Sequence, residues 1–110
     1  MKLLIAGSRS ITSVDLKQYV PPNVDTIISG GANGVDRLAE EYADINRLSK
    51  YIIRPRYELY GRAAPLKRNE EMVKAADSVL VIWDGMSKGA QYTINCAKKH
   101  NKPLVLIELK

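Results

Sequence analysis

The 110-residue sequence is poor in the residues that form disulfides, metal sites and catalytic triads, with one cysteine and one histidine. The single cysteine, Cys96, cannot form an internal disulfide, which is typical of proteins from a reducing cytoplasm. No apolar run is long enough to span a membrane, so we expect a cytoplasmic protein without a membrane segment. The sequence contains neither G-x-G-x-x-G nor G-x-x-x-x-G-K-S/T, so the dinucleotide-binding and P-loop fingerprints do not apply.

The composition is that of a folded domain with a basic surface. Hydrophobic residues make up 45% of the sequence and charged residues 26%, as in globular chains, and the length suits one core rather than two. A single domain is therefore predicted over residues 1–110. The formal net charge of +5 favours an anionic partner, but it does not distinguish a nucleotide from a nucleic acid or a merely solvated surface.

Apolar runs and amphipathic stretches alternate along the chain. Strands are predicted at 2–6, 25–29, 51–53, 78–83 and 104–109. Helices are predicted at 12–19, 33–48, 65–76 and 88–100, with a long irregular connection at 56–64. This alternation predicts an α/β fold, a Rossmann-like open parallel five-stranded sheet of order 3-2-1-4-5 with helices on both faces. Winding in that order reverses between the first and fourth strands, and ligands bind beyond the strand carboxyl ends at such a reversal.

The stretch 29–36, SGGANGVD, is the strongest local signal for a binding site. Its three glycines leave the backbone open, and the following helix directs free N–H groups and the positive end of its dipole at the loop. Such an arrangement binds anions, most often phosphate. The alternative is a tight turn that binds nothing. The loops 7–10 and 83–89 border the predicted reversal, and their coincidence with this loop favours a ligand site.

The candidate ligand-binding residues come from these loops and from the helix before the fourth strand. They are Gly7, Ser8, Arg9, Ser29, Gly30, Gly31, Ala32, Gly34, Asp36, Arg62, Arg68, Asn69, Trp83, Asp84, Gly85, Ser87 and Gly89. Arg9 either clamps a phosphate or is a solvated loop arginine. Asn69 interrupts an apolar helix face formed by Leu66, Val73 and Ala76, so it either holds a neighbouring loop or reads a polar edge of a ligand.

Other candidates have equally plain alternatives. Arg62, Lys67 and Arg68 lie at a helix entry where positive charge opposes the dipole, so either an anion compensates them or the surface tolerates the cost. Asp36 is favourable in the first turn of its helix in any case, but it could also contact a ribose hydroxyl or a metal. Trp83 either packs in the core or stacks on a base.

Histidine and cysteine chemistry is excluded by position. His100 closes a predicted helix at the end of the sheet opposite the loops, so it cannot partner their serines in a Ser-His-Asp triad. Cys96 has no second thiol or histidine at ligand spacing, so no zinc site is predicted. No cofactor is predicted either, although Mg²⁺ could accompany a nucleotide ligand.

Four motifs in this order resemble the SLOG superfamily, close to its YspA-like branch. They are GSRS at 7–10, SGGANGVDRLAE at 29–40, YGRAAPLKRNEEM at 60–72 and ADSVLVIWDGMSKGA at 76–90. The resemblance covers nearly the whole chain. It implies a Rossmann-like sheet and a nucleotide or nucleotide-derived ligand in the crevice.

Members that resemble the cytokinin-activating phosphoribohydrolases cleave a base from a nucleoside monophosphate with an arginine and a glutamate. Arg68 lies at the place of that arginine. Thr93 stands where their P-G-G-x-G-T-x-x-E motif ends in glutamate, and Ala90 replaces its threonine. Hydrolysis would therefore need another carboxylate to stabilise an oxocarbenium-like centre or to activate water, and Asp36 and Asp84 are the candidates.

DNA-processing protein A is similar in its versions of the SGGANGVD and PLKRN segments, and it binds single-stranded DNA. The basic charge agrees with this alternative, whereas only Tyr57 and Tyr60 offer loop aromatics for stacking. The principal expectation is a nucleotide-binding or nucleotide-sensing domain. A nucleotide-processing hydrolase and a single-stranded nucleic-acid binder are the alternatives.

A homo-oligomer, as a dimer, is also expected. It follows from the resemblance and from apolar residues on predicted outer helices. These are Tyr19, Tyr42, Met72 and Tyr92.

Overall fold

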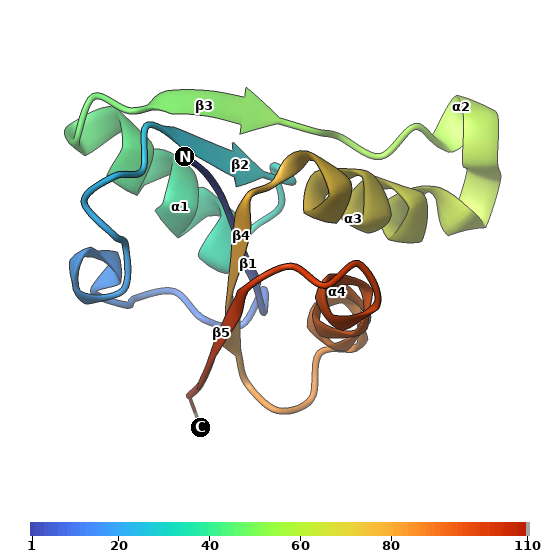
Figure 1. The fold of residues 1–110 in the computed structure, drawn as a ribbon. Helices are drawn as coiled ribbons and strands as arrows, with labels where there is room; N and C mark the ends of the chain where they lie inside the picture. Colours follow the sequence, from blue (N-terminus) through green and yellow to red (C-terminus); the bar gives the residue numbers. More distant parts are fainter. Residues whose placement is uncertain (110) are drawn as a thin grey trace.

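The computed structural model describes residues 1–109 (Figure 1). Its strands are β1 (Lys2–Gly7), β2 (Thr26–Ser29), β3 (Ser49–Ile52), β4 (Ser78–Trp83) and β5 (Leu104–Glu108). Its helices are α1 (Val35–Ile45), α2 (Tyr57–Tyr60), α3 (Ala64–Ala75) and α4 (Lys88–Lys99), with 3-10 turns η1 (Leu16–Gln18) and η2 (Gly61–Ala63). All five strands pair in parallel in the order β3-β2-β1-β4-β5, which confirms the predicted fold.

The two central strands are continuous apolar runs because helices cover both faces of the sheet. β1 and β4 pair from Leu3 with Ser78 to Gly7 with Ile82. The α1 and η1 segments cover one face, and α3 and α4 cover the other (Figure 1). The carboxyl ends of β1 and β4 therefore share one edge of the domain, at the reversal of winding. None of the helices in residues 1–109 is long and apolar enough to cross a bilayer.

The helix predicted over 12–19 is wrong. Only the three-residue turn η1 forms, and Asp15 caps it by accepting a hydrogen bond from Lys17 N at 3.2 Å. An isolated helix of eight residues is too short to be stable without tertiary packing. Here Ile11 and Leu16 are buried while their neighbours are mostly exposed, so the segment is anchored at two points rather than along a helical face.

The boundaries and faces of the other helices also differ from the prediction. α1 ends at Ile45, short of the predicted end at residue 48, and the Ile45 side chain is 80% exposed. Its buried face includes Val35, Ala39 and Ala43, because α1 lies flat on the sheet through small residues. The segment 56–64 is helical rather than irregular, forming α2 and η2. Its side chains are almost all exposed, so no apolar pattern marks these turns in the sequence.

For two apolar side chains, the burial seen in the structure is the reverse of the prediction. Leu66 is 43% exposed instead of continuing the apolar face of α3. Met72 is 1% exposed and belongs to the core between the sheet, α3 and α4, so it offers nothing to an oligomer surface.

Candidate functional site

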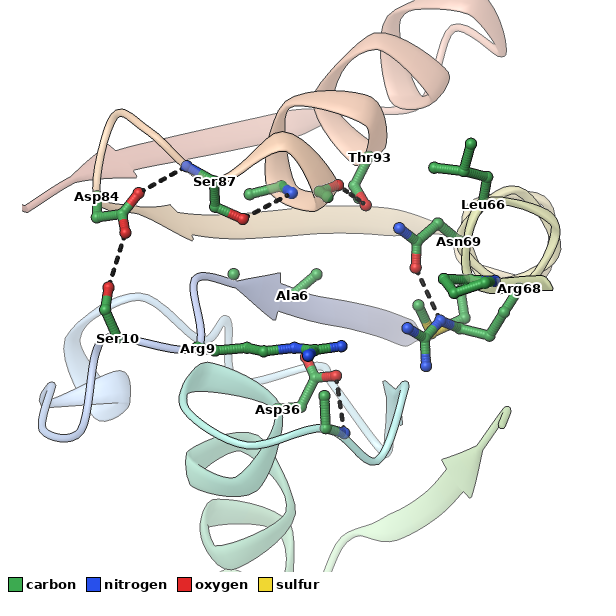
Figure 2. A pocket seen from close by; sticks show the side chains of 16 residues that line it. Ala6, Arg9, Ser10, Asp36, Leu66, Arg68, Asn69, Asp84, Ser87 and Thr93 are labelled. Carbon is green, nitrogen blue, oxygen red and sulfur yellow. Dashed lines mark hydrogen bonds between the residues drawn. The ribbon is translucent and has the colours of Figure 1, made fainter. Parts of the chain in front are cut away.

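A cavity of about 370 Å³ opens at the carboxyl ends of β1 and β4 (Figure 2). The loop after β1, the start of α1, the first half of α3 and the first turns of α4 surround it. The predicted site residues that line it are Gly7, Arg9, Ala32, Asp36, Arg68, Asn69, Asp84, Ser87 and Gly89. Those outside the lining are Ser8, Ser29, Gly30, Gly31, Gly34, Arg62, Trp83 and Gly85. The structure thus brings together about half of the predicted set, at the predicted reversal.

Arg68 and Asn69 form a buried pair on α3, exposed by 8% and 7%. Arg68 Nε donates to Asn69 Oδ1 at 2.8 Å, and Arg68 Nη1 donates to the carbonyl oxygen of Gly30 at 2.6 Å. These bonds explain why an amide interrupts the apolar face of α3: Asn69 orients the arginine. Its amide nitrogen is turned toward the space between α3 and α4 (Figure 2).

Asp36 is the buried carboxylate of the site, 7% exposed in the first turn of α1. Its Oδ2 accepts a hydrogen bond from Ala32 N at 3.2 Å. Burial raises the pKa of Asp36, and the Ala32 amide together with the charges of Arg68 and Arg9 only partly offsets this. A carboxyl group with a raised pKa inside a cavity is a candidate acid or base.

Arg9 is the most available cation of the site. It is exposed in the loop after β1, and its guanidinium extends toward Asp36 along the cavity (Figure 2). Within residues 1–109 its side chain makes no hydrogen bond and no ion pair within 4 Å. Burial, with the charge of Arg9 acting in the same direction, lowers the pKa of Arg68, whereas Asp36 raises it. Two guanidinium groups, those of Arg9 and Arg68, and two carboxylates, those of Asp36 and Asp84, therefore line one cavity.

The glycine loop lies at the cavity, which Ala32 lines. The N–H of Gly31 donates to Ser29 Oγ at 3.4 Å, and the N–H of Ala32 donates to Asp36 Oδ2. Two amides of the predicted phosphate cradle are thus bonded within the chain itself. In the helix itself, no side chain caps the N-terminus of α1.

Close packing explains the third glycine of that loop. Gly34 has φ 74°, and a Cβ there would collide with the carbonyl oxygen of Ser8 and the backbone of Arg9. The next amide, Val35 N, donates to Ser8 O at 3.3 Å. Gly34 therefore lets α1 dock against the loop after β1, which places Arg9 and Asp36 on one wall.

The loop before α4 is organised by Asp84. Its Oδ1 accepts from Met86 N at 2.8 Å and Ser87 N at 2.9 Å, and its Oδ2 accepts from Ser10 Oγ at 2.7 Å. These donors hold the pKa of Asp84 well below its usual range. In addition, Ser8 Oγ accepts from Asp84 N at 2.9 Å. Asp84 is an ionised loop anchor that joins the β1 and β4 loops.

The first turn of α4 faces the cavity. Ser87 caps this helix, its Oγ accepting from Ala90 N at 3.3 Å. Gly89 lines the cavity, and a Cβ there would meet nothing within 4 Å. Thr93, 2% exposed, donates to Gly89 O at 3.1 Å and brings no carboxylate from α4. The N-terminal turn of α4 therefore lies at the cavity, as does that of α1, which contributes Asp36.

Two remaining candidates belong to the framework or the exterior. Trp83 Nε1 donates to Ser87 O at 3.0 Å, and the indole packs against the core under α3 and α4. Core packing is therefore its observed role. Arg62 is exposed in η2, outside the cavity.

Several lining residues were not predicted. They are Ala6, Ser10, Pro65, Leu66, Met72, Ala90 and Thr93. Ser10 and Pro65 lie inside the motifs described above, so their position in the sequence could have identified them as lining residues. The apolar ones resemble ordinary core residues in sequence. Among residues 1–109 no group of three or more His, Cys, Asp or Glu side chains is arranged to hold a metal ion.

Comparison of the chain with protein-family models, with curated proteins and with solved structures returns no match. The class defined by the geometry is an α/β domain of Rossmann-like topology with a cavity at its winding reversal.

Proposed function

We propose that this domain binds a nucleotide or nucleotide-derived ligand, with a phosphate held between Arg9, Arg68 and the first turn of α4. The observation that carries the proposal is Arg9, whose guanidinium lies in a cavity of about 370 Å³ without a hydrogen bond or an ion pair within 4 Å among residues 1–109. That volume lies within the ordinary range for small-molecule sites. An anion would supply the hydrogen-bond partner that Arg9 lacks, and the winding reversal is where α/β sheets hold such ligands.

Arg9 and α4 supply the groups that a phosphate needs. A guanidinium that makes no hydrogen bond within the described residues can donate two parallel hydrogen bonds to phosphate oxygens. The first amides of α4 and its positive dipole end favour an anion beside Gly89, where no side chain intervenes. The proposal thus places the phosphate at the loop after β4 instead of the loop after β2.

The α3 wall suits the rest of a nucleotide. Pro65, Leu66 and Met72 contribute apolar surface to the cavity, and Asn69 contributes an amide beside it. Apolar walls with a few placed polar groups are the usual lining for a ribose and a base. The four motifs similar to the SLOG superfamily support the same ligand class, and we propose membership of that superfamily on those motifs. A cytoplasmic location is consistent with Cys96 as a free, buried thiol.

Hydrolysis of the bound nucleotide is the second candidate. The raised pKa of Asp36 and its place beside Arg68 favour it, because an N-glycosidic hydrolase needs a carboxylate near the sugar. Thr93 stands at the position of the relatives' glutamate, so Asp36 would have to do this work.

Calorimetric titration with nucleoside monophosphates, the matching nucleosides and inorganic phosphate tests the proposal. We expect saturable binding of monophosphates, weaker binding of phosphate and none of nucleosides at the same concentration. Equal binding of nucleosides and monophosphates would contradict it. Chromatography of the same mixtures after incubation detects a released base and separates a binding domain from a hydrolase.

We also propose a homodimer, on the family resemblance. Large apolar side chains remain exposed on α1 and α2, among them Ile45 at 80%, Tyr57 at 59% and Leu59 at 61%. Light scattering at working concentration should report twice the monomer mass. A monomer mass would remove this part of the proposal.

A further inference from the structure

A second cavity of about 210 Å³ lies on the other side of Arg68. Its lining residues come from the connection between β3 and α2, from Tyr60 of α2 and from α3. Figure 1 shows where these segments lie in the fold. We call this cavity the α3 cleft. Its cationic lining residues are Arg54, Arg56, Lys67, Arg68 and Lys74.

The α3 cleft has more positive charge than its acids can balance. Against five cations stand two carboxylates, Glu70 and Glu71. Lys74 already pairs with Glu70 at 3.3 Å. Arg56 and Lys67 have no side-chain hydrogen bond and no ion pair within 4 Å among residues 1–109. Two unpaired cations facing one small cavity favour an anion within it.

The glycine loop joins the α3 cleft to the first site. Gly30 O accepts from Arg68 Nη1 at 2.6 Å, and the next carbonyl, Gly31 O, accepts from Arg54 Nη1 at 3.5 Å. Gly31 has φ 72°, and a Cβ there would lie 2.6 Å from Arg54 Nη1. Consecutive carbonyls of one loop thus hold an arginine of each cavity. Arg68 lines both cavities, so groups bound in them would lie on either side of one guanidinium.

We propose that the α3 cleft is a second phosphate site, so that the preferred ligand carries two phosphates separated by one nucleoside. The inference rests on the proposed function for the first site and specifies its ligand class. Arg56 and Lys67 would hold the second phosphate through charge-assisted hydrogen bonds. Tyr60, 47% exposed at the cleft, offers a ring face to the intervening base. A dinucleotide and a single strand share this chemistry.

The test compares calorimetric affinities of a nucleoside monophosphate and its 5′-phosphorylated dinucleotide for the same chain. We expect the dinucleotide to bind wild-type protein about tenfold tighter or more, since a charged hydrogen bond contributes roughly 1.5–3 kcal/mol. Arg56→Ala and Lys67→Ala should each reduce that affinity ratio severalfold. Each should also flatten the salt dependence of dinucleotide binding. Lys17→Ala, an exposed cation on the other face of the sheet, should leave the ratio unchanged.

The outcomes separate the two proposals. If wild-type protein binds neither ligand, the proposed function fails and this inference fails with it. If the monophosphate binds but the ratio is near one, or if both cleft variants leave the ratio unchanged, only the second site is overturned. If the second site is upheld, a ten-nucleotide strand identifies the source of the second phosphate. Affinity equal to that of the dinucleotide assigns the cleft to a small ligand, and much tighter binding that depends on Lys67 assigns it to a single strand.

Discussion

Arg68 Nη1 donates a hydrogen bond to the carbonyl oxygen of Gly30 at 2.6 Å, joining α3 to a loop that precedes it by 38 residues. The same guanidinium is held through Nε by Asn69 and lines both cavities. Arg68 therefore connects α3 to the loop after β2 and also contributes a positive charge to the site. Arg9 lies in the same cavity without any such bond, so substituting each arginine in turn distinguishes effects on ligand binding from effects on stability.

Arg9→Ala should weaken binding of a nucleoside monophosphate without changing the melting temperature. Its guanidinium makes no hydrogen bond and no ion pair within 4 Å among residues 1–109, so its loss leaves no hydrogen-bonding group of the protein unsatisfied. The expected loss of affinity is roughly 10- to 100-fold, the equivalent of one charge-assisted hydrogen bond. Calorimetric titration and thermal unfolding measure the two effects. Lys99→Ala, at the far end of α4, is the matched control. Equal losses in both variants would mean diffuse electrostatic attraction.

Arg68→Ala should reduce both affinity and stability. It leaves the Gly30 carbonyl and the Asn69 amide oxygen without their donor, at a cost of about 1–3 kcal/mol of unfolding free energy. Arg68→Lys should not restore full stability, because one ammonium cannot reproduce the forked geometry of the guanidinium. Urea unfolding gives the stabilities. Full stability of the alanine variant would show that this connection is unnecessary.

Asp36→Asn tests the buried carboxylate. Because the pKa of Asp36 is raised in the folded state, its contribution to stability falls as pH rises above the usual value of 3.8. The asparagine variant lacks this decline, so it should be more stable than wild type at neutral pH, and its Oδ1 can still accept from Ala32 N. It should also bind monophosphates more tightly, since one negative charge is gone. Weaker binding would instead indicate a ligand hydroxyl on Asp36, and loss of base release would support hydrolysis.

Gly34→Ala and Gly89→Ala should act in opposite directions on stability. At Gly34 a Cβ meets the Ser8 carbonyl and the φ of 74° is unfavourable, so we expect a loss of roughly 1–3 kcal/mol. At Gly89 the space is open inside a helix, so alanine should add about 0.5–1 kcal/mol. If phosphate sits on the first turn of α4, Gly89→Ala should nevertheless weaken binding. Unchanged affinity in this stabilised variant would move the phosphate elsewhere.

The sheet could be predicted because each of its central strands is marked by a continuous apolar run within a short stretch of sequence. The runs at 2–6 and 78–83 are continuous and apolar, as strands covered on both faces must be, and alternation with helices leaves few topologies. Strand order in turn placed the loops after β1, β2 and β4 at one edge, so the site's position followed. The three-residue turn η1 and the helical segment α2 could not be predicted, because neither has an apolar face to mark it.

What only the tertiary structure decided is which polar groups are already bonded. The SGGANGVD pattern predicts a phosphate cradle, yet Ser29 Oγ and Asp36 accept from two of its amides. Asn69 has two plausible roles in sequence, holding a loop or contacting a ligand, whereas in the structure its Oδ1 accepts from the adjacent Arg68. The α3 cleft is lined by Arg54 and Arg56 and also by α3, whose first lining residue, Ala64, lies eight positions after Arg56 in the sequence. The periodicity of apolar residues indicates which side of a helix or strand is buried. Which polar groups are hydrogen-bonded, and where charges gather, depends on contacts between segments that meet only when the chain folds.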